Sequence, residues 1–175
     1  MKPGSSAEAL ALLKGLRAPP RLLRHVELVG EAADILLERF SSLGVAVDEE
    51  YVRVGVVLHD AGKVLHENEL AASGAQHEPA GEQLLLTHGV SPEIARVCLS
   101  HARWRYMSVS LKELLIALAD KLWKGVRSPD LEELVVSRVA AALSRDRWDL
   151  FVALDGAFEE IALGGDERLV RSQIY

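Results

Sequence analysis

Apolar residues recur along this chain at the spacing of α-helices. One apolar stripe in the first quarter of the sequence has side chains three or four positions apart, which places them on one face of a helix. It consists of Leu22, Val26, Val29, Ala33, Leu36 and Phe40. Runs of β-branched residues are short, and no hairpin signal joins two alternating segments. The pattern therefore predicts an all-α fold.

Start and stop residues divide the chain into a series of expected helices. The tripeptide Ser-Pro-Glu at residues 91–93 is a strong helix start. Asp48 is a suitable N-cap, and the acidic residues Glu49 and Glu50 suit the positive end of the helix dipole. The expected helices cover residues 7–16, 20–42, 48–64, 79–87, 91–103, 111–123, 128–143, 147–163 and 166–174.

Composition narrows the class of protein. The chain has 175 residues, 49% of them apolar and 26% charged, which suits one globular domain. A net charge of −6 argues against general nucleic-acid binding. The single cysteine, Cys98, excludes an internal disulfide framework. No apolar run is long enough to span a membrane, and residues 1–10 lack the pattern of a signal peptide. We therefore expect a cytoplasmic protein without a membrane or nucleic-acid partner.

The pair His59-Asp60 is the strongest chemical signal. It interrupts VGVVLHDAGKVL, an otherwise apolar stretch between Val54 and Leu65. A buried carboxylate and imidazole cost several kcal/mol unless a partner satisfies them. Both side chains are good ligands for a divalent metal ion, so a metal site is one solution.

Four further side chains of metal-binding type point toward the same interior. His25 lies on the apolar stripe of residues 22–40, and His101 faces the apolar side of its own expected helix. Asp120 interrupts LLIALADKLW, the most apolar helix of the chain. His77 lies just before the helix expected at residue 79, where a side chain can reach into a cleft.

Each of these residues also has a purely structural interpretation. His25 and His101 taken singly are best read as hydrogen-bonded core histidines. Asp120 can form a surface ion pair with Lys124 at i+4, and His77 can cap a helix. As a group, however, they would need unrelated partners in a core with few other polar groups. The combination therefore favours a shared metal site.

The order of these residues resembles a known family. His25, then His59-Asp60, then Asp120 resembles the H…HD…D signature of HD-superfamily metal-dependent phosphohydrolases. The local segments RLLRHVELVGEAADIL, LHDAGK, HEPAG and LADKL are similar to the family's motifs as well. The resemblance covers about residues 21–126 and implies a single-domain HD-type helical bundle holding one or two divalent ions.

The resemblance also implies a ligand set and a division of the chain. By this resemblance the first metal is held by His25, His59, Asp60 and Asp120. His77 and His101 complete a second site, with Asp60 bridging the two ions. The metal itself is open among Mn, Fe, Mg, Co, Ni and Zn. Residues 1–20 are then an N-terminal helical extension, 21–127 the metal-binding core, and 128–175 helices packed on that core within the same domain.

The sequence departs from the family pattern in two places, one at the second metal site and one that bears on the activity. Many members with two metals carry a second histidine where this chain has Ala102. The acidic pair that follows the HD motif in guanosine tetraphosphate hydrolases is replaced by Lys63-Val64, and the motif of cyclic-dinucleotide phosphodiesterases is not seen. The segment HARWRYMSVSLKELLIALADKLWKGVR is similar to a stretch of bacterial HD-type symmetrical diadenosine tetraphosphatases.

Basic residues near the ligands are candidates for binding phosphate. Lys63, three residues after Asp60, is the first choice, and we expect these two residues to be catalytic. For every basic candidate, a solvated surface charge is the alternative. The candidates for substrate binding are Arg24, Lys63, Arg103, Arg105, Lys124 and Arg127.

The expected function is metal-dependent hydrolysis of a phosphate ester or anhydride. The substrate is a phosphorylated small molecule, with a nucleotide as the first choice, and metal-activated water attacks it. One alternative is a di-iron oxygenase, because some HD-fold enzymes use the same ligands to activate oxygen. Another is a regulatory protein with a degenerate site. Assembly into a homodimer is also left open.

Overall fold

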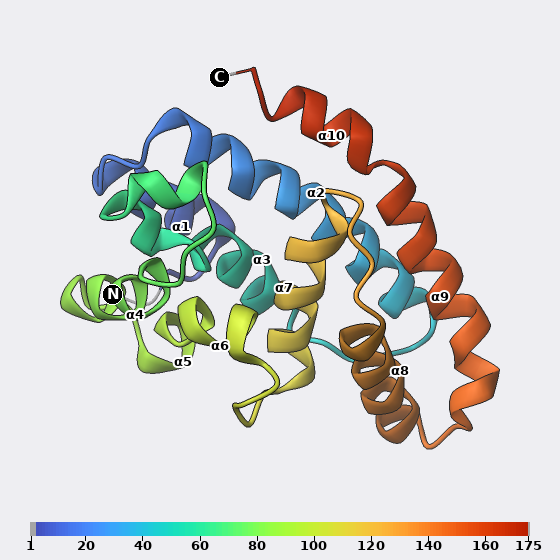
Figure 1. The fold of residues 1–175 in the computed structure, drawn as a ribbon. Coiled ribbons are helices and arrows are strands. Elements are labelled where there is room, and N and C mark those ends of the chain that lie inside the picture. Colours follow the sequence, from blue (N-terminus) through green and yellow to red (C-terminus); the bar gives the residue numbers. More distant parts are fainter. Residues whose placement is uncertain (1–2, 175) are drawn as a thin grey trace.

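Three helices form the centre of the molecule. The computed structural model describes residues 3–174. In it, α2 (Pro20–Ser42) crosses the molecule and packs against α3 (Glu49–Leu58) and α7 (Leu111–Leu122), which also pack against each other (Figure 1). Residues 3–174 contain helices and no strand, which confirms the all-α prediction.

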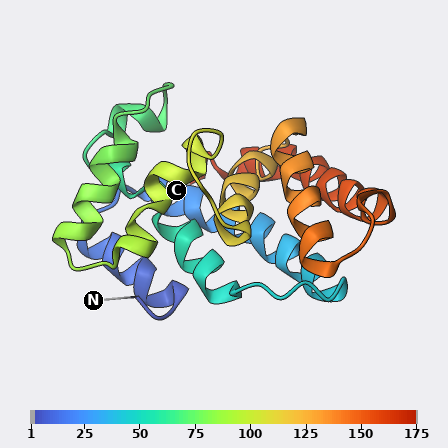
Figure 2. The ribbon, with the colours of Figure 1, turned by 90° about the horizontal axis from the view of Figure 1, so that it is seen from below.

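The remaining helices lie in two groups on either side of this centre, at opposite ends of the view in Figure 2. One group follows the HD motif and consists of η1 (Ala61–Val64), η2 (Glu67–Leu70), α4 (His77–Thr87), α5 (Pro92–Ala95) and α6 (Val97–Arg103). The other group is C-terminal and consists of α8 (Pro129–Leu143), α9 (Arg147–Leu163) and α10 (Gly165–Arg171). The first helix, α1 (Ser6–Gly15), packs mainly on α3.

Local signals in the sequence account for several helix starts. The Asp48 carboxylate accepts a hydrogen bond from the backbone N–H of Tyr51 at 3.0 Å, as expected of an N-cap. At the start of α7, Ser110 and Glu113 form a reciprocal capping box. Proline occupies the first turn of α2, α5 and α8, where its missing N–H costs nothing.

The helix that follows Asp48 is shorter than the one expected over residues 48–64. It ends at Leu58, and residues 61–64 form a 3-10 turn instead. The backbone leaves helical geometry at Asp60, where φ is −106° and ψ is 17°. The structure shows the reason: the chain must turn here to pass directly against α4.

Two other boundaries also differ from expectation. α4 begins at His77 and not at Pro79, because the Glu69 carboxylate accepts the backbone N–H groups of Gln76 and His77 at 3.2 and 3.1 Å and so caps the helix. The single helix expected over residues 91–103 is divided into α5 and α6. Next to this break, the Glu93 carbonyl accepts a hydrogen bond from the Tyr51 hydroxyl at 2.9 Å.

The turn after the HD motif touches α4 backbone to backbone. A Cβ atom on Gly62 would lie 1.9 Å from the carbonyl oxygen of His77. A Cβ atom on Gly81 would lie 2.8 Å from the Gly62 nitrogen and 2.9 Å from the Cys98 sulfur. Only glycine permits this approach, and the approach carries His77 to Asp60.

The C-terminal helices are fixed to the centre by two arginines. Buried Arg168 donates to the carbonyl oxygens of Trp123 at 2.7 Å and Leu122 at 3.3 Å, at the end of α7, and also to that of Ile161. Arg171 makes a bidentate ion pair with Glu31 of α2, at 2.8 and 2.5 Å. These bonds join the last helix to the two helices that carry His25 and Asp120.

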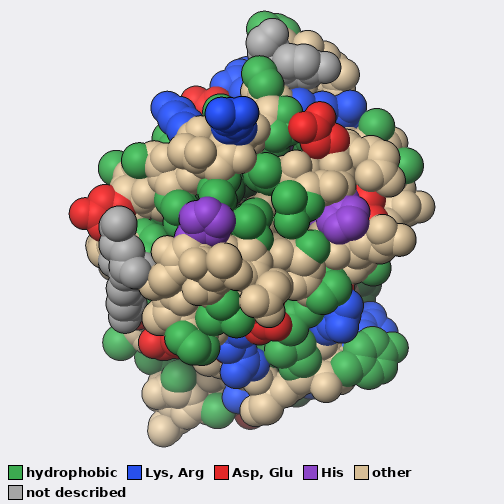
Figure 3. Space-filling view, turned by 90° about the vertical axis from the view of Figure 1, so that its left-hand side faces the viewer, with side chains coloured by type: hydrophobic (Ala, Val, Ile, Leu, Met, Phe, Trp, Pro, Cys, Tyr) green, Lys and Arg blue, Asp and Glu red, His purple; other side chains and the backbone are tan. Residues whose placement is uncertain are grey.

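The surface is mixed in character. On the face shown in Figure 3, basic side chains lie toward the top and the bottom. Between them lie mainly apolar side chains and histidines, with acidic side chains toward the edges. None of the helices within residues 3–174 combines the length and apolar character that a membrane crossing requires.

We predict that Gly62→Ala destabilises the protein and that Gly30→Ala does not. The added methyl at residue 62 meets the backbone of α4, which costs about 1–3 kcal/mol of unfolding free energy or more. Gly30 lies inside α2, and a methyl group added there would meet nothing within 4 Å, so alanine should add about 0.5–1 kcal/mol. Urea unfolding followed by circular dichroism measures both, and equal midpoints for Gly62→Ala and the parent chain would refute the prediction.

Candidate metal centre

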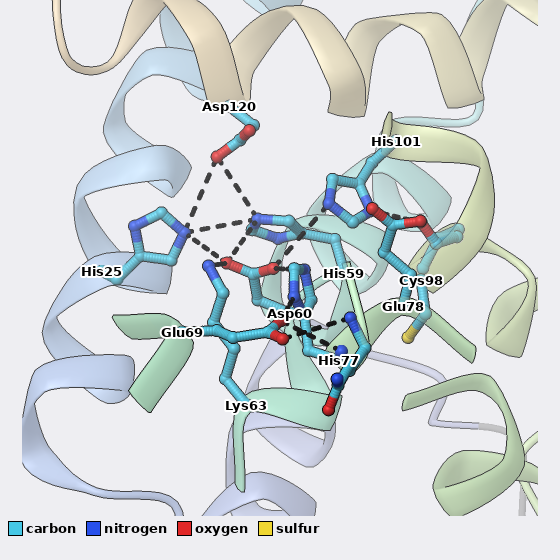
Figure 4. Close-up of polar contacts among 12 residues, drawn as sticks. His25, His59, Asp60, Lys63, Glu69, His77, Glu78, Cys98, His101 and Asp120 are labelled. Atoms are coloured by element: carbon cyan, nitrogen blue, oxygen red, sulfur yellow. Dashed lines mark hydrogen bonds and ion pairs between the residues drawn. The ribbon is translucent and has the colours of Figure 1, made fainter. Parts of the chain in front are cut away.

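The Asp60 carboxylate lies between two groups of imidazoles (Figure 4). It follows the end of α3 and is almost fully buried, at 2% exposure. Its Oδ2 atom is 3.0 Å from His25 Nε2, whereas its Oδ1 atom is 3.1 Å from His77 Nε2 and 3.8 Å from His101 Nε2. The two oxygens of one carboxylate therefore face two different groups.

The first group has the spacing of a metal coordination shell. His59 Nε2 is 3.3 Å from His25 Nε2 and 3.5 Å from both Asp60 Oδ2 and Asp120 Oδ1. His25 Nε2 is 3.7 Å from Asp120 Oδ1. Two ligand atoms bound at ~2.0–2.2 Å and roughly 90–115° apart are themselves about 2.8–3.7 Å apart. His25, His59, Asp60 and Asp120 therefore fit one divalent ion.

The second group contains buried polar atoms without partners. Asp60 Oδ1 and His77 Nε2 are 3.1 Å apart, but their geometry is not that of a hydrogen bond, and neither atom has another hydrogen-bond partner among residues 3–174. His59, Asp60 and His101 also present ligand atoms within 4.8 Å of one another. A buried polar atom without a partner is costly, and a cation between these groups would satisfy both atoms. The donor set therefore fits a second ion with Asp60 as the shared ligand.

Hydrogen bonds on the far side of each ring orient the histidines. His59 Nδ1 faces the Val56 carbonyl at 2.7 Å, and His101 Nδ1 faces the Val97 carbonyl at 3.0 Å. A carbonyl can only accept, so Nδ1 carries a proton and Nε2 is the nitrogen that faces the centre, where the neutral ring can bind a cation.

Glu69 orients the ring of His77 by a hydrogen bond in the same way, and it was not identified from the sequence. Its Oε2 atom is 2.5 Å from His77 Nδ1, and the side chain is nearly buried, at 8% residue exposure. The hydrogen bond from His77 lowers the pKa of Glu69. Glu69 stands in a polar segment beside exposed Glu67, and nothing in the local pattern separates the two acids. Only the fold brings Glu69 under the ring of His77.

The electrostatics keep the carboxylates ionised. Burial by itself raises the pKa of Asp60, but His59, His25 and His77 outweigh it and hold that pKa well below its usual range. Burial likewise raises the pKa of Asp120, and His59 and His25 lower it further than burial raises it. Charged carboxylates are the form that binds a cation.

The same environment shifts the pKa values of the histidines in opposite directions. Burial and the neighbouring His59 lower the pKa of His101 to about 4, so its imidazole is neutral. Burial also opposes a charge on His59 and on His77, but the Asp60 carboxylate, with Asp120 or Glu69, raises both pKa values above the usual range. The centre thus attracts positive charge.

A cavity of 590 Å³ opens onto this centre. Among the basic candidates, Lys63 and Lys124 line it, and Lys63 Nζ is 2.6 Å from Asp60 Oδ2. Arg24 is paired with Glu27 and lines a different cavity. The other candidates do not line the cavity and are held by acidic partners: Arg103 by Glu78, Arg105 by Asp130, and Arg127 by Glu132 and Asp155.

Two structural alternatives can now be decided. Asp120 makes no ion pair with Lys124 within residues 3–174, and its oxygens face His25, His59 and Lys121. Cys98 is buried, donates to the Leu58 carbonyl at 3.3 Å, and has a pKa raised by burial. It is therefore a core thiol.

Trp123 is a further residue of the site that the sequence did not reveal. Its ring meets the His25 ring edge-on, with centroids 5.1 Å apart. It is 7% exposed, lines the cavity, and its Nε1 atom has no hydrogen-bond partner in the described structure. It lies three residues after Asp120, so one helical turn carries both side chains to the cavity.

Comparisons with known proteins place the ligand candidates of this centre within a recognised domain. The family model described as HD domain matches residues 22–124 of the chain, which include all six of the ligand candidates. The chain is also 25% identical over 143 residues to an uncharacterized protein of Methanocaldococcus jannaschii, across 73% of this chain and 80% of that protein. No solved structure gives a significant match.

We predict two ions per chain at saturation and one in His101→Ala. The variant removes a ligand of the second group, whereas the first group keeps its full set. Metal analysis of dialysed protein and calorimetric titration with manganese give the stoichiometry. A parent chain that binds a single ion, unchanged by His101→Ala, would contradict the shared-carboxylate arrangement.

We predict that Glu69→Gln lowers the affinity for the second ion by about 10–100-fold, which is the usual effect of removing the hydrogen-bond partner of a metal-bound histidine. Glu67→Gln is the matched control, because it removes the same charge from an exposed site on the same turn. The affinities come from the same titration. Equal affinities in the two variants would assign Glu69 to helix capping alone.

Proposed function

The chain belongs to the HD domain family, and on that premise we propose that it is a metal-dependent phosphohydrolase acting on a nucleotide-like small molecule. Members of this family are generally metal-dependent hydrolases. The observation that carries the proposal is the place of Asp60, with one oxygen toward each ligand group at the base of a cavity lined by basic side chains.

The ligand candidates have a defined task in this proposal. His25, His59, Asp60 and Asp120 hold one divalent ion, and His77 and His101 hold a second one together with Asp60. When bound, such an ion lowers the pKa of a coordinated water and offsets charge on a phosphoryl oxygen. A mixture of imidazole and carboxylate ligands suits a transition-type ion such as manganese or iron.

Lys63 is proposed to bind the phosphate that reacts. Its ammonium group lies next to Asp60 Oδ2, at the inner end of the cavity. With an ion held by Asp60, the Lys63 ammonium group would be free to donate to a phosphate oxygen. Lys124 lines the same cavity, two residues beyond the end of α7.

The basic side chains in the lining of the cavity favour an anionic substrate, as a phosphohydrolase requires. The same six ligands would also suit a di-iron oxygenase, which the identity of the bound metal and oxygen consumption would distinguish. A regulatory protein with a degenerate site is disfavoured, because no member of the six-residue set is missing.

The test is a screen of phosphate esters and anhydrides with metal-loaded protein. We expect release of phosphate or nucleotide in the presence of manganese, and its loss in Asp60→Ala with the circular dichroism spectrum retained. The variant removes a shared ligand but almost no apolar area. Full activity of Asp60→Ala would overturn the proposed function, and oxygen consumption by iron-loaded protein without phosphate release would favour the oxygenase.

Lys63→Ala should reduce kcat/KM by about ten- to hundredfold while metal content stays unchanged. The expected loss corresponds to a charge-assisted hydrogen bond of about 1.5–3 kcal/mol to the substrate phosphate. Lys14→Ala is the control, because Lys14 is an exposed lysine on α1 outside this cavity. Normal turnover in Lys63→Ala would return Lys63 to the role of a solvated charge.

A further inference from the structure

Three basic residues line the cavity beyond the metal ligands. Arg21 comes from the first turn of α2, Lys121 from the last turn of α7, and Lys124 follows directly after α7. With Lys63 they give the cavity four basic side chains in a chain whose net charge is −6. The lining also holds four carboxylates: Asp60 and Asp120 belong to the ligand set, Glu69 is bonded to His77, and Glu78 is paired with Arg103. The basic side chains are therefore the groups that can bind an anion in this cavity.

Two of these residues are without acidic partners. Arg21 and Lys124 make no ion pair and no hydrogen bond with any residue in the described part of the chain. Most other arginines are paired with carboxylates, among them Arg24, Arg53 and Arg127. Both unpaired cations line the same cavity, so both are free to bind one anionic ligand there.

A neutral donor points to the same ligand. Trp123 lines this cavity, and its Nε1 atom is buried without an acceptor among residues 3–174. An indole N–H can only donate, so the group that satisfies it must carry an acceptor. A phosphate oxygen meets this requirement as well as that of the two cations.

The outer wall of the cavity is made by the C-terminal helix. Leu169, Ser172 and Gln173 also line the cavity, although they lie beyond the matched family domain. The ion pair between Arg171 and Glu31 holds this segment against α2. With this wall the cavity measures 590 Å³, which is more room than a single phosphate at the metal centre fills.

We infer that Arg21, Lys124 and Trp123 Nε1 form a second anion subsite, which binds a phosphate group next to the one that reacts. Lys121 lies beside them and adds charge. The inference rests on the proposed function for the reacting phosphate, but the subsite itself is a binding property. It assigns the substrate to compounds with two or more linked phosphates, such as nucleoside polyphosphates, in preference to simple monophosphates.

The experiment compares tripolyphosphate with orthophosphate by calorimetry on manganese-loaded protein. Manganese is kept in excess over the added anion, so that the anion does not strip the protein of metal. The double variant Arg21→Gln/Lys124→Gln removes both free cations. The control, Lys14→Gln/Arg138→Gln, removes the same two charges from exposed sites on α1 and α8 that this cavity does not include.

We expect the subsite variant to lose about tenfold or more in affinity for tripolyphosphate, the effect of losing one or more charge-assisted hydrogen bonds. Its affinity for orthophosphate and its metal content should stay within about twofold of the parent. Trp123→Phe, which keeps the ring against His25 but removes the N–H, should show a smaller loss in the same direction.

The control variant separates a subsite from a general effect of charge. Equal losses in the control and the subsite variant, or none in either, would overturn the inference. Parent protein that prefers orthophosphate to tripolyphosphate would overturn it as well. Failure of the proposed function looks different, because tripolyphosphate then binds through Arg21 and Lys124 while no phosphate compound is hydrolysed.

Discussion

The structure depends on how one buried carboxylate is neutralised. Asp60 is removed from water and yet held ionised by the imidazoles of His59, His25 and His77, on three different segments of the chain. An isolated charge at this depth would cost several kcal/mol. The surrounding segments must therefore stay together for the charge to be tolerated, and a bound cation would satisfy the atoms that the protein leaves without partners.

Close backbone contacts make this arrangement geometrically possible. The glycines at residues 62 and 81 let the turn after the HD motif lie directly on α4, which carries His77. At the other end, Gly165 approaches Gly125 so closely that a Cβ atom would lie 2.3 Å from the Gly125 nitrogen. Buried Arg168 joins the same two segments through carbonyl oxygens. Packing of main chain on main chain thus holds both ends of the site.

Charge is distributed unevenly around the cavity, and this matters for function. Away from the cavity most arginines are bound to carboxylates, so they stabilise helix contacts and are unavailable to a ligand. This explains why Arg103 and Arg127, although close in sequence to the ligands, do not reach the cavity. Lys63 and Lys124 do reach it, together with Arg21, which the motif pattern did not single out. Nearness to the ligands along the sequence therefore did not predict which basic side chains line the cavity.

The sequence by itself determined the all-α fold, most of the helix starts and the six ligand candidates. These depend on local rules: helical periodicity, capping residues, and polar side chains that interrupt apolar faces. Only the tertiary structure decided that the helix after Asp48 stops at Leu58, that Glu69 lies under His77, and that Trp123 and the C-terminal helix line the cavity. Each of these depends on contacts between residues distant in sequence or on a sharp turn, which no local pattern encodes.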